Sequence, residues 1–177
     1  MKGLIMQLKG KTAIITGGGS GFGASMADLF AKNGAKVIVA DIDLDSARKV
    51  AEGTGGYPLE VDVSNAKSVE QMKIDIFKEH KKVDIVVNNA GTTHLPAPME
   101  TIEEDEFDRV FNVNCKSVYL TAKHFVPHFK ENKSGVILNI ASTAGVSPRP
   151  NLNWYNSSKV WMILASKTMA VELAPFG

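Results

Sequence analysis

The fold is decided by residues 12–30, which read TAIITGGGSGFGASMADLF. An apolar run, 12–16, is followed at once by a glycine-rich stretch, 17–23, and then by apolar residues at helical spacing. Glycines are needed where a backbone turns tightly and approaches a pyrophosphate, whose charge then lies on free amides at a helix N-terminus. A strand, a glycine turn and a helix in this order predict the first unit of a dinucleotide-binding fold.

Short runs rich in Val and Ile alternate with longer amphipathic stretches along the rest of the chain, a pattern typical of βαβ units that build a parallel sheet. We expect strands at Thr12–Thr16, Lys36–Ala40, Tyr57–Val61, Val83–Val87 and Val136–Ile140. We expect helices at Gly21–Asn33, Leu44–Glu52, Ala66–Lys82, Thr101–Glu131 and Tyr155–Glu172. Right-handed crossovers then give an α/β fold with a doubly wound parallel sheet, Rossmann-like, in three layers α/β/α.

Composition is that of an ordinary globular domain: 177 residues, 44% hydrophobic, 22% charged and a net charge of +1. Nearly balanced charges give no basic field for nucleic acid. No apolar run reaches the roughly 18 residues of a membrane span, and residues 1–10 lack a signal-peptide pattern. The single cysteine, Cys115, excludes an intrachain disulfide. We expect a cytoplasmic protein without nucleic-acid, membrane or metal partners.

Several polar or glycine-bearing segments directly follow predicted strands, so they meet at the carboxyl edge of the sheet, where ligands of open α/β sheets bind. Asp41 ends the second strand, and a carboxylate there accepts hydrogen bonds from the adenosine ribose and repels a 2′-phosphate. Because position 20 is serine and not Arg or Lys, NAD is favoured over NADP. Asp41 as a plain turn carboxylate, and Asp62 as a turn former, remain alternatives. The predicted cofactor-binding residues are Gly17, Gly19, Ser20, Gly21, Phe22, Gly23, Asp41, Asp62, Val63, Asn89, Ala90 and Gly91.

Tyr155 and Lys159 are four residues apart, which puts them on one face of a helix. A phenol is a poor base at neutral pH, but an ammonium held nearby favours its ionised form. Ser142 ends the fifth strand at the same sheet edge, where its hydroxyl can donate to a substrate carbonyl oxygen. Plainer interpretations remain for both motifs. Tyr155 and Lys159 could be two solvated helix residues, and Ser142 could be an ordinary turn residue whose predicted role Thr143 would take. Together they predict acid–base chemistry beside the nucleotide.

Taken in order, these motifs resemble the short-chain dehydrogenase/reductase family. The motifs are Thr16-Gly17-x-x-x-Gly21-x-Gly23, Asp62, Asn88-Asn89-Ala90-Gly91, Asn114, Ser142 and Tyr155-x-x-x-Lys159. The resemblance implies that Tyr155 is the general acid/base and that Ser142 positions the substrate oxygen. It implies that Lys159 favours the ionised phenol and, with Tyr155, contacts the cofactor, and that Asn114 bends its helix to hold a water in a proton relay. It also implies hydride transfer at a carbinol carbon and a homotetramer or dimer.

The chain departs from that family mildly at Tyr155-Asn156-Ser157-Ser158-Lys159, where members often have Tyr-x-Ala-Ser-Lys, and more strongly at its end. Members usually continue into a sixth strand, a lid and a seventh strand, so we expect residues 1–177 to be one dinucleotide-binding and catalytic domain truncated at its C-terminal end. Substrate contacts are expected from Thr92–Met99 and Ala144–Trp154, where Arg149 could attract an anion or be a solvated loop residue. The leading hypothesis is an NAD(H)-dependent oxidoreductase for a secondary alcohol or ketone. The alternatives are an NADPH-dependent 3-ketoacyl-type reductase and a non-catalytic dinucleotide-binding or assembly module.

Overall fold

Five parallel strands form the centre of the computed structural model, which describes residues 7–177. Their order across the sheet is β3-β2-β1-β4-β5. The strands are β1 (Thr12–Thr16), β2 (Lys36–Asp41), β3 (Tyr57–Glu60), β4 (Ile85–Asn88) and β5 (Val136–Asn139). The chain winds outward from β1 to β3 and then crosses to β4 on the other side, which creates a topological switch point beside β1. The predicted doubly wound fold is confirmed.

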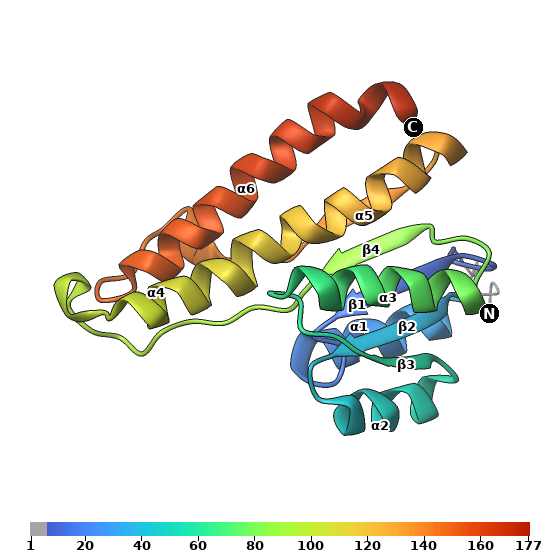
Figure 1. Ribbon diagram of the computed structural model, residues 1–177, viewed down its shortest axis with the longest axis horizontal. Helices are drawn as coiled ribbons and strands as arrows, with labels where there is room; N and C mark the ends of the chain where they lie inside the picture. Colours follow the sequence, from blue (N-terminus) through green and yellow to red (C-terminus); the bar gives the residue numbers. More distant parts are fainter. Residues whose placement is uncertain (1–6) are drawn as a thin grey trace, which may run out of the picture.

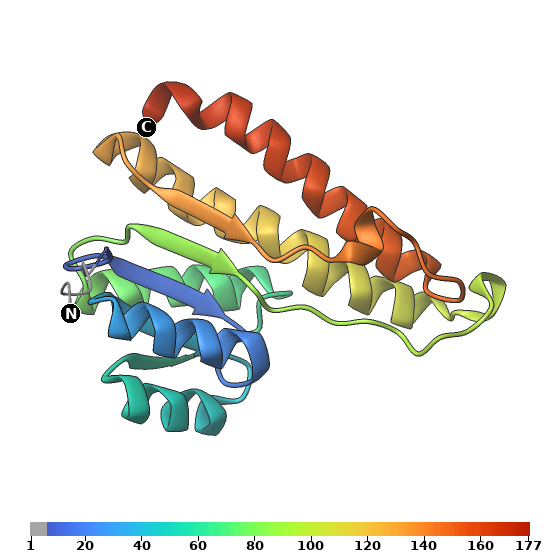
Figure 2. The same cartoon turned by 180° about the vertical axis from the view of Figure 1, so that it is seen from behind.

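Helices cover both faces of the sheet (Figures 1 and 2). One face carries α1 (Gly21–Lys32) and α2 (Leu44–Thr54), and the other carries α3 (Ala66–Glu79) and α5 (Ser117–Asn132). The remaining helices are α4 (Glu104–Phe111) and α6 (Asn153–Leu173), with short 3-10 turns at η1 (Met99–Thr101), η3 (Thr143–Gly145) and η4 (Ala174–Phe176). In Figure 2 the loops that precede α4 and α6 extend together beyond the carboxyl ends of the strands.

The core is built by strand residues that alternate between the two helical layers. Ala13 and Ile15 of β1 face α1 and α2, whereas Ile14 between them faces α3 and α5. All five residues of β1 are buried, because a central strand of a parallel sheet is covered on both sides. The glycine stretch therefore leaves the most deeply buried strand, which fixes its position.

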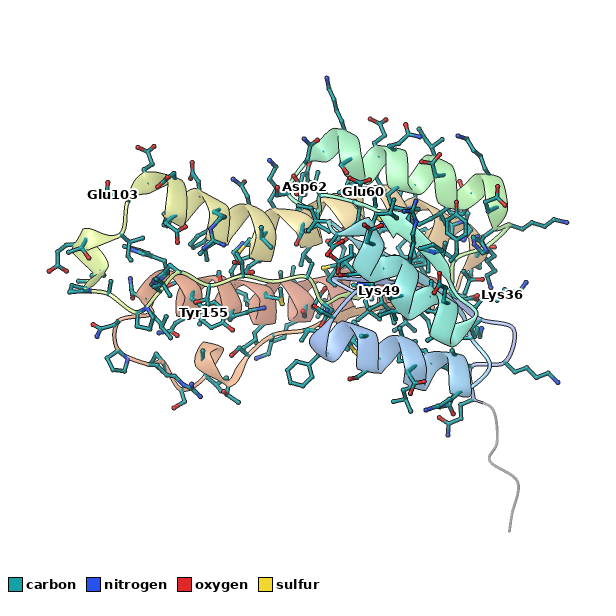
Figure 3. All side chains as sticks on the ribbon, turned by 90° about the horizontal axis from the view of Figure 1, so that it is seen from below. Lys36, Lys49, Glu60, Asp62, Glu103 and Tyr155 are labelled. Carbon is teal, nitrogen blue, oxygen red and sulfur yellow. The ribbon has the colours of Figure 1, made fainter. Side chains whose placement is uncertain are left out.

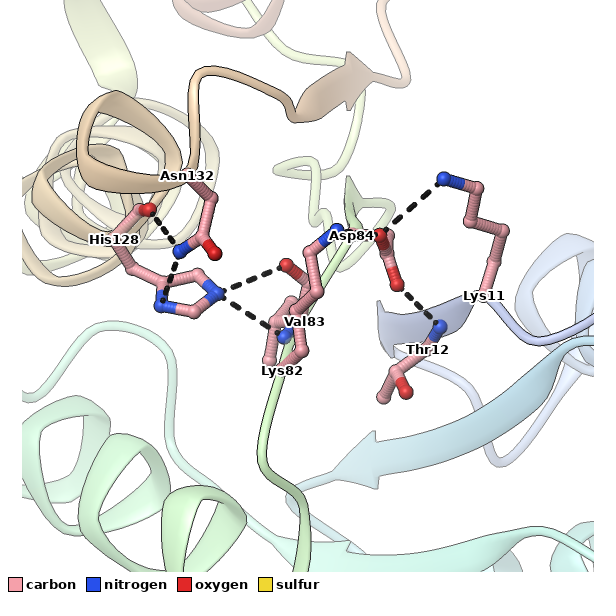
Figure 4. Close-up of polar contacts among 7 residues, drawn as sticks. All are labelled: Lys11, Thr12, Lys82, Val83, Asp84, His128 and Asn132. Carbon is pink, nitrogen blue, oxygen red and sulfur yellow. Dashed lines mark hydrogen bonds and ion pairs between the residues drawn. The ribbon is translucent and has the colours of Figure 1, made fainter.

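The opposite, amino-terminal edge of the sheet is held by a buried carboxylate (Figure 4). Asp84 accepts the backbone N–H of Thr12 at 3.0 Å and pairs with the ammonium groups of Lys82 at 2.8 Å and Lys11 at 3.4 Å. Burial opposes the charged form of Asp84, but the hydrogen bonds from Lys82 and Thr12 outweigh it, so the pKa of this carboxyl lies below its usual value. His128 lies nearby, with Nε2 3.3 Å from the backbone nitrogen of Val83.

One predicted helix, Thr101–Glu131, is wrong as a single element. The structure has α4, then a π-helical turn η2 (Asn112–Lys116), then α5. The π turn inserts extra backbone length, and Asn114 and Cys115 within it are buried. The helix expected at Ala66–Lys82 ends earlier, at Glu79. Within residues 7–177, no helix is both long and apolar enough to cross a membrane.

Candidate active site

The glycine turn after β1 is fixed to the segment after β4. The hydroxyl of Thr16 accepts the backbone N–H groups of Asn89 and Ala90, each at 3.1 Å. In return, the side-chain amide of Asn89 donates to the carbonyls of Thr16 and Gly17, both at 3.0 Å. Gly17 (φ +62°) and Gly21 (φ +52°) adopt left-handed backbone conformations that other residues seldom accept. The two segments expected at one sheet edge thus form one hydrogen-bonded unit.

Helix α1 approaches this turn so closely that only glycine fits at its third residue. A Cβ atom on Gly23 would lie 2.0 Å from the carbonyl oxygen of Gly17 and 2.7 Å from Asn89 Nδ2. Ser20, at the N-cap of α1, makes no side-chain capping bond, so the first amides of the helix are not occupied by that side chain. This arrangement presents backbone N–H groups and the positive end of the helix dipole to a ligand.

A cavity of about 410 Å³ lies against this turn. The predicted cofactor residues that line it are Gly17, Ser20, Gly21, Phe22, Asp41, Asp62, Val63, Asn89, Ala90 and Gly91. Four predicted cofactor residues are not part of the lining: Gly19 and Gly23, which pack the turn, and Tyr155 and Lys159. Three lining residues were not predicted: Ile42, Val61 and Val113. The position of Ile42 directly after Asp41 could have indicated it, since an apolar residue beside a carboxylate that is predicted to bind a ribose suits an adenine ring.

The two predicted carboxylates make turn hydrogen bonds as well as lining the cavity. Asp41 accepts the backbone N–H of Gly19 at 2.8 Å and that of Asp43 at 3.1 Å. Asp62, labelled in Figure 3, accepts the N–H of Ser64 at 2.9 Å and its hydroxyl at 2.6 Å. The turn-forming alternative is therefore correct for both residues, and their place on the cavity wall is compatible with a ligand as well.

Tyr155 and Lys159 lie on the first turns of α6, where Figure 3 labels Tyr155. Lys159 is only 4% exposed, and its ammonium donates to the carbonyl of Ile140 at 2.9 Å, just beyond the end of β5. Burial lowers the pKa of Lys159 from its usual value, because a poorly solvated ammonium is disfavoured. The ammonium lies 6.0 Å from the ring centroid of the half-buried Tyr155. The i, i+4 pair is thus anchored against the sheet and is not a solvated helix face.

Ser142 caps the 3-10 turn η3 that packs against Lys159. Its Oγ accepts the backbone N–H of Ala144 at 3.1 Å, which leaves the hydroxyl hydrogen free to donate elsewhere. A Cβ atom on Gly145 would lie 3.1 Å from the backbone of Lys159, so this turn and α6 are in close contact. Ser142 is two residues beyond the carbonyl that binds the Lys159 ammonium.

Asn114, fully buried in the π turn, connects the segment after β4 with helix α6. Its Oδ1 accepts the N–H of Thr92 at 2.8 Å, and its Nδ2 donates to the Thr92 carbonyl and to the hydroxyl of Ser158, both at 2.9 Å. A Cβ on Gly91 would lie 3.4 Å from both Asn114 Oδ1 and Lys159 Nζ. Because Gly91 also lines the cavity beside the glycine turn, the Lys159 ammonium lies next to the wall of that cavity.

Comparison with known proteins identifies the family. The family model for short chain dehydrogenase matches residues 11–177. The chain belongs to the short-chain dehydrogenase family. It is 44% identical to 4-formylbenzenesulfonate dehydrogenase of Comamonas testosteroni, over 97% of this chain and 70% of that relative. It is 36% identical to a 3-oxoacyl-[acyl-carrier-protein] reductase of Thermotoga maritima, over 96% and 70% of the two chains.

Solved structures of this family share the fold. A 3-ketoacyl-(acyl-carrier-protein) reductase from Brucella melitensis, complexed with NADH, superposes with a TM-score of 0.94 at 46% identity, over 96% of this chain and 73% of that one. NAD+-bound xylitol dehydrogenase superposes with a TM-score of 0.91 at 27% identity, over 97% and 68%. The protein is therefore an oxidoreductase of the short-chain dehydrogenase family.

Proposed function

We propose that the protein transfers a hydride between NAD(H) and a secondary alcohol or ketone, with Tyr155 as the general acid/base. The observation that carries this proposal is the meeting of the two halves of the site at Gly91. The dinucleotide cavity reaches that glycine, and a Cβ placed there would be 3.4 Å from the buried ammonium of Lys159. The Lys159 ammonium therefore lies next to one residue of the cavity wall, which supports the proposal.

The residues around the cavity suit a dinucleotide. Glycine backbone at Gly17 and Gly21 leaves room for a pyrophosphate at the start of α1, where the helix dipole favours negative charge. Asp41 on the cavity wall would accept the hydroxyls of an adenosine ribose and repel a 2′-phosphate, which favours NAD over NADP. The NADH complex of the Brucella relative is consistent with this preference. When bound, the cofactor supplies the hydride acceptor for alcohol oxidation and the hydride donor for the reverse reaction.

The chain's own residues supply the proton chemistry. Ser142, whose hydroxyl hydrogen is free, would donate to the substrate oxygen and hold it beside Tyr155. Tyr155 would remove the proton from an alcohol oxygen, or deliver it to a ketone oxygen. Lys159, fixed by the Ile140 carbonyl, would favour the phenolate and hold the nicotinamide ribose. Asn114 fixes Thr92 and Ser158 and so positions the substrate loop relative to α6.

The decisive experiment compares Tyr155→Phe with wild type in NADH binding and in turnover of small secondary alcohols and ketones. We expect the variant to lose turnover by at least about a hundredfold, the typical contribution of a general acid/base, while NADH affinity changes little. Tyr119→Phe, at an exposed tyrosine of α5, is the matched control and should behave as wild type. Undiminished turnover in Tyr155→Phe would refute the proposed role, and NADH binding without turnover in wild type would favour a non-catalytic module.

A 3-ketoacyl-type reductase is the second candidate, because the relatives at 36% and 46% identity carry that activity in their names. NADH and NADPH affinities separate a general NAD-dependent enzyme from an NADPH-dependent reductase. We expect NADH to bind at least about tenfold more tightly, since a carboxylate facing a phosphate is a like-charge contact. Asp41→Asn should reduce the ratio of NADH affinity to NADPH affinity.

We also propose a homo-oligomer, formed partly through α6. Val160, Leu164 and Val171 share one face of this helix and are 48%, 64% and 80% exposed. An apolar stripe of this kind on a helix suits burial against a second copy of the same helix. Light scattering on the purified protein should give a dimer or tetramer, and Leu164→Glu should shift it toward a smaller species.

A further inference from the structure

The segment that follows β4 is held in place by side chains. Residues 89–96 make no backbone–backbone hydrogen bond within residues 7–177. The hydroxyl of Thr16 binds the first two amides of this segment, and the side-chain amide of Asn114 binds both backbone groups of Thr92. Neither of these side chains bonds to the segment beyond Thr92, in the direction of the loop expected to contact substrate. The position of that part therefore depends on a third side chain.

This third side chain is Arg109 of α4, whose guanidinium reaches the segment. Its Nη1 donates to the hydroxyl of Thr92, and its Nη2 donates to the carbonyl of Thr93 at 3.0 Å. Glu106, one turn earlier on α4, accepts from Nε at 2.9 Å and from Nη2 at 3.0 Å. The rigid, planar fork is thus fixed on one side by the carboxylate and binds the segment on the other. Because the hydrogen bond from Arg109 lowers the pKa of Glu106, the carboxylate stays ionised at neutral pH.

Beyond these bonds the segment turns one side chain inward and the next outward. His94 is 1% exposed, and its Nδ1 lies 2.8 Å from the Leu95 carbonyl oxygen, whereas the Leu95 side chain is 84% exposed. The next tie is at Ala97, whose N–H donates at 3.0 Å to the carbonyl of Asn151, in the loop that precedes α6 (Figure 2). The stretch that presents Leu95 is therefore held at one end by Arg109 and at the other by Asn151.

We propose that Arg109 is a positioning residue for substrate binding: through Thr92 and Thr93 it fixes the start of the loop that contacts the substrate. Arg109 does not line the dinucleotide cavity, and its hydrogen bonds reach neither Tyr155 nor Lys159. The effect on substrate rests on the proposed function, whereas the fixing of the loop does not. Because this loop would contact the substrate away from its reacting carbon, loosening it weakens the binding of substrate and transition state alike.

The test compares Arg109→Gln with Arg48→Gln. Arg48 is the matched control, since it forms an exposed ion pair with Asp45 at the same i, i+3 spacing, on α2. KM and kcat are measured for the substrate that wild type turns over fastest in a panel containing cyclohexanol, cyclohexanone and acetophenone. We expect Arg109→Gln to raise KM about tenfold, the equilibrium effect of one charge-assisted hydrogen bond, while kcat and NADH affinity stay within about twofold of wild type. Arg48→Gln should match wild type, and both variants should have similar urea midpoints, because exposed ion pairs add little stability.

Two further variants separate position from charge. Lysine at position 109 keeps the charge but lacks the planar fork, so Arg109→Lys should recover only part of the change in KM. Thr92→Val removes the hydroxyl acceptor and keeps both backbone bonds to Asn114. Because Arg109 then has one bond fewer to lose, Arg109→Gln should raise KM less in the Thr92→Val protein than in wild type.

Hydrogen exchange followed by NMR gives a readout that needs no turnover. The N–H of Thr92 bonds to Asn114 only while the segment is in place, so this amide should exchange at least about tenfold faster in Arg109→Gln than in Arg48→Gln. Unchanged KM, full recovery in Arg109→Lys, or unchanged exchange at Thr92 would each overturn the proposal. A joint fall in kcat, NADH affinity and stability would also overturn it, because it indicates a structural role alone. If wild type turns over no secondary alcohol or ketone, the proposed function fails, and the exchange rate at Thr92 alone decides whether Arg109 fixes the loop.

Discussion

The replacement of Gly23 by alanine tests whether the glycine turn is shaped for a ligand. Two opposing effects determine the change in the free energy of unfolding. Alanine inside a helix is favoured over glycine by about 0.5–1 kcal/mol. The added Cβ would lie 2.0 Å from the Gly17 carbonyl oxygen, which is backbone and is itself held by Asn89. Because neither atom can rotate away, the turn or α1 must move by about 1 Å, and such overpacking typically costs about 1–3 kcal/mol.

We therefore expect Gly23→Ala to destabilise the protein by up to about 2.5 kcal/mol net and to weaken NADH binding by at least about tenfold. Gly53→Ala is the matched control, since Gly53 is a helical glycine of α2 whose added Cβ would meet open space, with nothing to displace within 4 Å. That control should gain about 0.5–1 kcal/mol and bind NADH as wild type does.

Urea unfolding followed by tryptophan fluorescence measures the stability of both variants, and NADH fluorescence measures their affinity. We expect Gly23→Ala to lower the free energy of unfolding and Gly53→Ala to raise it, although the chemical substitution is the same. If Gly23→Ala matched Gly53→Ala in stability and bound NADH normally, the close approach of α1 to the turn would not be a requirement of the site.

Three further predictions concern buried polar groups. Asp84→Asn should lower the free energy of unfolding by about 1–3 kcal/mol at pH 7. Because folding lowers the pKa of Asp84, its stabilising contribution is fully present above the ordinary value of 3.8 and is lost as pH falls through the folded pKa. Urea titrations of the variant and the wild type should therefore give the same free energy of unfolding at acid pH. Burial raises the pKa of Cys115 to about 11, so only about one thiol in a thousand is ionised at pH 8, and iodoacetamide should label the folded protein more than about a hundredfold more slowly than the unfolded one. Asn114→Ala leaves both backbone groups of Thr92 unpaired and should lower the free energy of unfolding by about 2–4 kcal/mol in urea titrations.

The sheet and most of the dinucleotide cavity could be predicted from sequence because their signals are local. An apolar run predicts a buried strand, and glycines or an acidic residue directly after it lie at the carboxyl edge of the parallel sheet. Asp41 and Asp62 follow this rule, and both line the cavity. Helical spacing alone predicted that Tyr155 and Lys159 lie on one face of a helix. The hydrogen bond from Lys159 to the Ile140 carbonyl shows that this face is turned toward the end of β5.

Other features could not be predicted because tertiary contacts create them. The π turn has no propensity signature, and only the family resemblance, which implies a bend at Asn114, indicated an irregularity there. The turn coincides with the bonds of Asn114 to Thr92 and Ser158, which come from two distant elements. Val113 looks like any core residue in sequence, yet it lines the cavity. The bonds of Arg109 to the segment after β4 depend on how α4 packs beside that segment, which no pattern of residue types encodes.

The π turn at Asn112–Lys116 also sets the rotational phase between the helices on either side of it. Each residue of an α-helix advances the chain by about 100° and 1.5 Å, so removal of a single residue from this turn would rotate all of α5 by that angle. Phe125 and Phe129, now in the core, would swing toward solvent. Insertions and deletions should therefore be tolerated in the exposed loop ahead of α4 but not within these five residues, which act as a fixed spacer between α4 and α5.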